Sequence, residues 1–186
     1  PDAHMQTVEA SQHEEGRTVD AGAQGKTHLS VGLMVFHALK DHEQEAQRET
    51  FTLTHPITIN EGSRSIIALP FDGLRITCTS ADDRGIHTQH LTIDIDSETY
   101  EAQIAPARTF GFRDQVEMLL KAGLIKGGAL DNALVCDGEN WLNPPLRFVD
   151  EPVRHKLLDL IGDLALVGLP QAQVMAYRGS HALHTQ

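Results

Sequence analysis

The segment Val153–Asp163 places one histidine and two carboxylates at helical spacing. His155 and Asp159 are four residues apart, so on a helix they share one face, and Asp163 follows one turn later. An imidazole and a carboxylate placed in this way can both reach one zinc ion. The other faces of this helix are apolar, so the helix should be largely buried. A buried carboxylate without a partner is costly, so these aspartates should have partners. A plain His–Asp pair on the solvated stripe of a helix has the same spacing, and both interpretations stay open at this point.

Two further segments carry groups that could take part in chemistry. In Ala107–Phe112, the hydroxyl of Thr109 and the backbone N–H groups could donate to an anion or to a developing oxyanion. The alternative is a turn between a strand and a helix, with two core phenylalanines. In Gly179–Leu183, His181 stands at a predicted helix start and could carry a proton beside a nearby carboxylate. Taken alone, it is typical of a surface histidine.

The elements that must position these groups follow from the hydrophobic pattern. Alternating and β-branched residues predict strands at 51–54, 57–59, 65–69, 74–79, 91–95, 99–104, 133–136 and 173–177. Helical spacing and end signals predict helices at 28–46, 114–122 and 150–167, with a further helical segment from 180. Asp72-Gly73 predicts a hairpin between its two neighbouring strands. Strands come first and helices later, which favours an α+β layered fold over a βαβ repeat.

Composition excludes several classes of protein. The 186 residues are 40% hydrophobic, which is enough for one sizeable core or two small ones and too much for a disordered chain. A net charge of −11 argues against a broad nucleic-acid surface. No apolar run approaches the roughly 18–20 residues of a transmembrane helix. Cys78 and Cys136 are too few for a disulfide scaffold, so we expect a reducing cytosol. The chain starts at Pro1 and stops within a predicted helix, so we expect a piece of a longer protein.

Five blocks in the same order resemble the second half of the zinc-dependent UDP-3-O-acyl-N-acetylglucosamine deacetylases, the LpxC family. They are ARTFGF at 107–112, GGALDNA at 127–133, LRFVDE at 146–151, VRHKLLD with IGD at 153–163, and GSHAL at 179–183. The resemblance implies a two-layer sandwich of β-sheet and helices. Residues 55–186 would form a second domain that carries the zinc-binding helix and an insert for the acyl chain. Residues 1–54 would be a remnant, or a divergent end, of a first domain.

The resemblance also implies a function and roles for individual residues. The function is zinc-dependent deacetylation of UDP-3-O-acyl-N-acetylglucosamine, the committed step of lipid A (lipopolysaccharide) biosynthesis in the bacterial cytoplasm. The implied roles are as follows: His155 and Asp159 bind zinc, Thr109 stabilises the oxyanion, Asp163 and His181 form a charged pair, and Lys156, Phe110 and Phe112 contact the substrate. The insert at 113–147 would form the acyl-chain passage, lined by Leu119, Leu120, Leu124 and Ile125.

One element of the family pattern is not intact. The family's first domain supplies a Thr-x-Glu-His stretch with the third zinc ligand and the general base, and the nearest string here is Thr7-Val8-Glu9-Ala10. Glu9 could be the base, but Ala10 would replace the ligand. Three hypotheses therefore stay open: a deacetylase or a piece of one, an impaired relative that only binds substrate or a partner, and a fragment that does not fold alone. A fusion of the parent protein to a hydroxyacyl-acyl-carrier-protein dehydratase is also compatible with the sequence.

Overall fold

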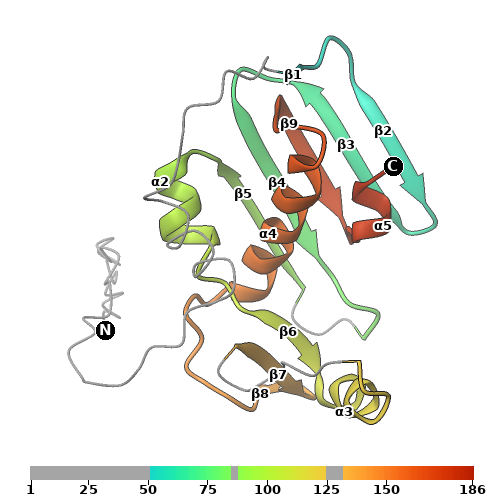
Figure 1. Ribbon diagram of the computed structural model, residues 1–186, viewed down its shortest axis with the longest axis vertical. Coiled ribbons are helices and arrows are strands. Elements are labelled where there is room, and N and C mark those ends of the chain that lie inside the picture. Colours follow the sequence, from blue (N-terminus) through green and yellow to red (C-terminus); the bar gives the residue numbers. More distant parts are fainter. Residues whose placement is uncertain (1–50, 85–87, 125–131) are drawn as a thin grey trace, which may run out of the picture.

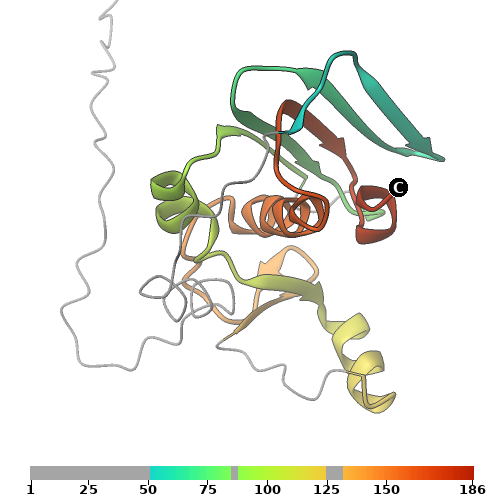
Figure 2. The same ribbon diagram turned by 45° about the horizontal axis from the view of Figure 1, so that its top comes forward.

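The computed structural model describes residues 51–84, 88–124 and 132–186, and these form two sheets with one long helix between them (Figure 1; Figure 2). The larger sheet has the order β2-β3-β9-β4-β5, and β1 pairs with β9. Its strands are β1 (Phe51–Thr52), β2 (Ile57–Glu61), β3 (Arg64–Pro70), β4 (Leu74–Ser80), β5 (Gln89–Asp94) and β9 (Pro170–Tyr177). The layered sheets and helix confirm the predicted α+β class.

Helix α4 (Glu151–Ala165) packs on the larger sheet and carries the candidate metal ligands. Pro152 fits its first turn, because the N–H that proline lacks has no partner inside the helix there. Val153, Leu157 and Leu160 are fully buried in the core, against strand residues such as Ile76 and Val174. This apolar stripe fixes the rotation of the helix and leaves its other faces to the polar side chains.

The smaller sheet contains β6 (Thr109–Phe112), β7 (Ala133–Asp137) and β8 (Asn140–Trp141). Strands β6 and β7 are parallel, and α3 (Arg113–Lys121) lies between them in sequence, so this part of the chain is a βαβ unit. Figure 2 shows α4 between this sheet and the larger one. The predicted helix at 114–122 is confirmed, and the segment expected as a possible strand-to-helix turn is itself strand β6.

The hairpin predicted at Asp72-Gly73 is wrong. Strands β3 and β4 follow each other in sequence, but β9 lies between them, antiparallel to β3 and parallel to β4. The turn exists, with Gly73 at φ 105°, yet the two strands it joins are not hydrogen-bonded partners. A local turn signal cannot reveal a strand inserted from about a hundred residues later in the chain.

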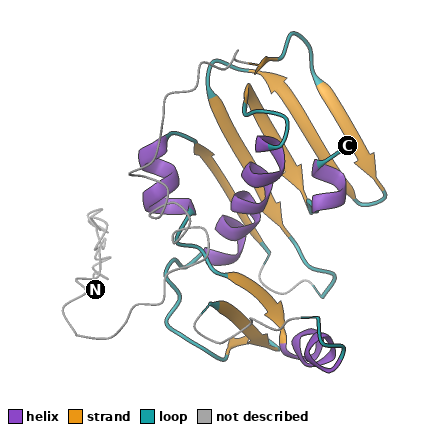
Figure 3. Cartoon of the chain, in the orientation of Figure 1, coloured by secondary structure: helices purple, strands orange, loops and turns teal. Residues whose placement is uncertain are grey.

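The strand predicted at 99–104 is also wrong, because these residues are helical (Figure 3). Helix α2 (Ser97–Thr99) continues into a π-helical turn, η1 (Tyr100–Ile104). Asp96 caps this segment, since its carboxylate accepts the backbone N–H of Thr99 at 2.7 Å. The cap outweighs the strand preference of the threonine, tyrosine and isoleucine.

The other helices and strands predicted within the described residues are present, with bounds that differ by a few residues, including the final helix, α5 (His181–His184). The helix predicted at 28–46, the string at 7–10 and Ile125 lie outside the described residues. Within the described ranges, every helix falls short of the length and apolarity that crossing a bilayer requires.

Candidate active site

His155 and Asp159 face each other across one turn of α4. The Nδ1 atom of His155 lies 3.1 Å from the carbonyl oxygen of Ala107, and a carbonyl can only accept, so Nδ1 carries the proton. The unprotonated Nε2 is therefore the free ring nitrogen, 3.5 Å from Oδ1 of Asp159. Burial lowers the pKa of His155, against the opposing effect of Asp159, and so favours the neutral ring that a metal ligand requires.

The separation of these two atoms fits a shared metal ion. Two ligand atoms about 2.0–2.1 Å from a tetrahedral zinc ion are about 3.4 Å apart, close to the 3.5 Å between Nε2 of His155 and Oδ1 of Asp159. Both side chains are 18% exposed, so an ion could enter while most water is excluded. The other oxygen of Asp159 accepts a hydrogen bond from Lys156 at 3.3 Å. The pair is therefore already oriented as a two-ligand half-site.

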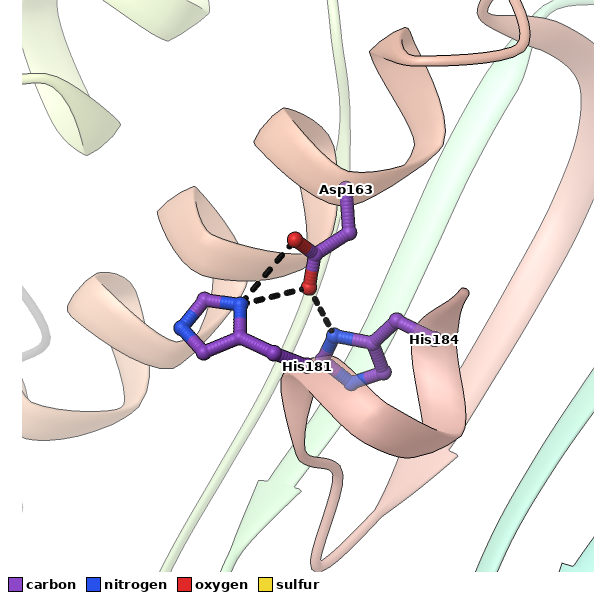
Figure 4. A group of neighbouring side chains, drawn as sticks. All are labelled: Asp163, His181 and His184. Atoms are coloured by element: carbon purple, nitrogen blue, oxygen red, sulfur yellow. Dashed lines mark hydrogen bonds and ion pairs between the residues drawn. The ribbon is translucent and has the colours of Figure 1, made fainter. Parts of the chain in front are cut away.

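Asp163 forms a second cluster with two histidines, drawn in Figure 4. Its Oδ2 lies 2.8 Å from Nδ1 of His181 and 2.8 Å from Nδ1 of His184. These are hydrogen-bond distances, shorter than the spacing of two ligands on one zinc ion. The Asp163–His181 pair expected from the sequence is thus formed, and His184 is a third member that sequence reasoning missed. Its only signal in the sequence is its position three residues after His181.

A buried ion pair connects α4 to the segment that precedes β6. Glu151 at the start of α4 is fully buried, and Arg108 is 7% exposed. The carboxylate of Glu151 accepts the backbone N–H of Arg108 at 2.9 Å and its guanidinium at 2.9 and 3.1 Å. Arg108 follows Ala107, whose carbonyl holds His155. The pair was not identified as a site feature from the sequence, because a charged pair carries no local pattern when its members are 43 residues apart.

The remaining predicted site residues lie on or beside β6. Thr109 is exposed and lies two residues after Ala107, whose carbonyl contacts His155, and one after Arg108, which is bonded to Glu151. Phe110 lies under the Lys156 ammonium, 5.7 Å from the ring centroid. Phe112 is buried, with the Arg84 guanidinium 4.2 Å from its ring centroid. Each contact is within the range of a cation–π interaction.

A cavity of about 370 Å³ opens beside these phenylalanines. Its charged lining includes Arg64, Arg84, Lys156, Arg178, Asp82 and Asp83. Arg178 pairs with Asp83, and Arg84 pairs with Asp114 at 2.6 Å. Basic groups outnumber acidic ones in this lining, which suits an anionic ligand. Cys78 also lines the cavity, but burial raises its pKa to about 11, so its thiol is protonated at neutral pH.

The structure describes three of the four leucine and isoleucine residues expected to line the acyl-chain passage. Leu119 on α3 is half-buried, Leu120 on the same helix is 52% exposed, and Leu124 just after it is 71% exposed. Met118 adds a further exposed apolar side chain, at 62%. The surface of α3 therefore offers apolar side chains to a ligand or to another part of the protein.

Comparisons with known proteins identify relatives of this chain. The family model of the UDP-3-O-acyl N-acetylglycosamine deacetylases matches residues 33–186. A UDP-3-O-acyl-N-acetylglucosamine deacetylase of Synechocystis sp. is 50% identical over 149 residues, which are 79% of this chain and 54% of that protein. One from Thermosynechococcus vestitus is 52% identical over 145 residues, covering 77% and 50% of the two chains.

A plant protein is also similar. The probable UDP-3-O-acyl-N-acetylglucosamine deacetylase 1, mitochondrial, of Arabidopsis thaliana is 41% identical over 160 residues, which are 80% of this chain and 49% of that protein. The chain thus spans about half the length of the curated relatives it matches.

Proposed function

The chain belongs to the UDP-3-O-acyl-N-acetylglucosamine deacetylase family, and on that premise we propose that its protein hydrolyses the acetamide of UDP-3-O-acyl-N-acetylglucosamine in a zinc-dependent reaction. The products are the free amine and acetate, in the committed step of lipid A biosynthesis in the bacterial cytoplasm. The observation that carries the proposal is the His155–Asp159 half-site, with Nε2 and Oδ1 3.5 Å apart and each side chain held by a second contact.

His155 and Asp159 are the proposed zinc ligands. When bound, zinc supplies Lewis-acid polarisation of the amide carbonyl and a water of lowered pKa. A catalytic zinc normally has three protein ligands. We propose that the third ligand and the general base come from outside the described residues, in a first domain of which residues 1–54 are the end. Residues 55–186 are the proposed second domain, and β1, just before that boundary, pairs with β9 of its sheet.

Three residues are proposed to act on the reacting amide. The Thr109 hydroxyl donates a hydrogen bond to the oxyanion. His181 is 69% exposed, so its ring can reach a bound substrate and give a proton to the departing nitrogen. Asp163 is 13% exposed and accepts from Nδ1 of His181, so Nε2 is the ring nitrogen left to serve a bound substrate.

The basic cavity is the proposed site for the sugar diphosphate. Lys156 lies at the junction of this cavity and the half-site, because its ammonium contacts both Asp159 and the ring of Phe110. Phe110 and Phe112 form an apolar part of the cavity wall. The apolar side chains of α3 are proposed to line the passage for the acyl chain.

The alternative is an impaired relative that binds the substrate, or a partner, without turnover. It is favoured by Ala10, which stands where the nearest Thr-x-Glu string would need a histidine. Two protein ligands alone should hold zinc much more weakly than three.

Elemental analysis of the purified chain after mild dialysis tests the proposal first. Near one zinc per chain would place the third ligand within residues 1–54, and that zinc should be lost in His155→Ala and retained in the matched control His90→Ala, since His90 lies on β5 and bonds Thr79 instead. Near zero would mean that His155 and Asp159 are a half-site without a third ligand in this chain. Acetate release from UDP-3-O-acyl-N-acetylglucosamine is then measured on the same samples. Substrate binding without zinc-dependent acetate release would establish the alternative. Unchanged zinc content in His155→Ala would refute the ligand assignment.

A further inference from the structure

His184 and His181 share one carboxylate oxygen but differ in their surroundings. Oδ2 of Asp163 is 2.8 Å from Nδ1 of each ring. The side chain of His181 is 69% exposed, whereas that of His184 is 2% exposed. Figure 4 shows the two imidazoles on the same side of Asp163, both carried by the short helix α5. One ring is therefore free to meet a substrate, and the other is enclosed by protein.

The hydrogen bonds of the cluster assign its protons. An ionised carboxylate only accepts, so each contacting Nδ1 must carry a hydrogen. In a neutral His184 ring, Nε2 then has a lone pair and no hydrogen. This Nε2 is buried and has no hydrogen-bond partner among the residues that the structure describes. A protonated ring would bury a charged N–H donor without an acceptor. This costs more free energy than a buried neutral nitrogen whose lone pair accepts no hydrogen bond. The neutral Nδ1–H form is thus the one that fits this site.

The surroundings of His184 hold its ring in one place. Ser180 caps α5, accepting the backbone N–H of Leu183 on its Oγ at 3.3 Å and that of His184 on its carbonyl oxygen at 2.9 Å. Leu183 is fully buried and anchors the same turn. The ring also fills the space beside Gly179, where an added Cβ would overlap Nε2 and lie 3.2 Å from Cε1. The donor aimed at Asp163 is therefore fixed by packing on several sides.

We propose that His184 is a positioning residue: its buried Nδ1–H holds the Asp163 carboxylate in the orientation that receives His181. This deepens the proposed function, because Asp163 and His181 are its proposed charged pair. A neutral anchor orients the carboxylate without cancelling its charge, which stays available to His181. An anchor of this kind is useful where the second ring is exposed and would otherwise sample several rotamers.

Histidine tautomers, measured by ¹⁵N NMR on the metal-free chain at a pH where both rings are neutral, test the proposal. We expect the Nδ1–H form for His184 and predominantly for His181. His184→Leu keeps apolar volume but removes the donor, so the Nδ1–H fraction of His181 should fall by about twofold or more as Asp163 turns away. His184→Asn keeps an N–H near the position of Nδ1 and should restore that fraction. His90→Ala is the matched control for loss of a histidine elsewhere.

Two results would overturn the proposal. One is an Nε2–H tautomer of His184 in the wild-type chain, a measurement that does not depend on any variant folding. The other is an unchanged His181 tautomer in a folded His184→Leu chain, judged by a dispersed amide spectrum. Neither measurement uses zinc or substrate. A chain that fails to deacetylate the substrate could therefore still show the positioning role of His184, and a failure of that role would not refute the proposed deacetylation.

Discussion

Glu151 accepts both the backbone N–H and the guanidinium of Arg108, so a single carboxylate fixes the main chain and the side chain of the same residue. It also accepts the backbone N–H of Arg147 at 2.7 Å. The next residue back from Arg108 is Ala107, whose carbonyl sets the tautomer of His155. The next residue forward is Thr109, at the start of β6. The pair therefore links the start of α4 to the segment that contacts the proposed ligand His155 and carries the proposed oxyanion donor Thr109.

Removal of the Glu151 carboxylate should strongly destabilise the chain. Glu151→Ala leaves the guanidinium of Arg108 buried without its partner, which typically costs about 3–5 kcal/mol of unfolding free energy. Urea denaturation measures this loss. Arg108→Met combined with Glu151→Met should recover much of it, because replacing both charges by apolar groups removes the unpaired ion. The exposed Arg75–Asp94 pair is the control, and Asp94→Ala should change stability far less. Equal effects at the two sites would contradict this account.

The same carboxylate should make stability depend on acid pH. Burial alone would raise the pKa of Glu151, but the hydrogen bonds from Arg108 and from the Arg147 backbone outweigh it and lower the pKa. The unfolded chain, with a glutamate pKa of about 4.3, then binds more protons than the folded chain below that pH. The stabilisation is present above about pH 4.3 and is lost as the pH falls through the folded value.

Urea midpoints measured between about pH 6 and pH 3 test this dependence. Glu151→Gln cannot titrate, so its midpoint should fall less steeply over this range than that of the wild type. If the urea midpoint of Glu151→Gln falls with pH as steeply as that of the wild type, other carboxylates account for the acid sensitivity.

Thr109 should affect turnover more than binding. Its side chain is exposed at the start of β6 and is proposed to donate only to the oxyanion, so Thr109→Val should lower kcat by about 10²–10³-fold with little change in KM. Thr109→Ser retains the hydroxyl and should keep most of the activity. Steady-state kinetics of acetate release separate the two variants. A similar loss in the serine variant would instead indicate a packing role for the threonine methyl group.

Gly179 and His184 should be coupled energetically. A Cβ at position 179 would overlap the His184 ring, so Gly179→Ala should cost about 1–3 kcal/mol by overpacking. His184→Ala removes the ring, so adding Gly179→Ala to that background should cost much less. A double-mutant cycle from urea denaturation gives the coupling. Additive effects of the two changes would mean that the ring moves aside without cost.

Much of the site was predictable because its signals are local. The i, i+4 spacing of His155 and Asp159 depends only on helix geometry, and Pro152 and the apolar stripe of α4 mark that helix in the sequence. The family blocks around these residues also predict the class of protein from residue identity alone. The segment at 99–104 is the instructive exception, where the Asp96 cap overrode the strand preference of the residues after it.

Tertiary structure decided the relationships between distant residues. Strand β9 lies between β3 and β4, Glu151 pairs with Arg108, and His184 meets Asp163 across 21 residues of chain. None of these follows from spacing, since each depends on which surfaces the core brings together. The sequence by itself therefore determined which groups could bind a metal and on which element they lie. Only the packed chain decided which tautomers and carboxylate orientations those groups adopt, because these are set by partners far away in the sequence.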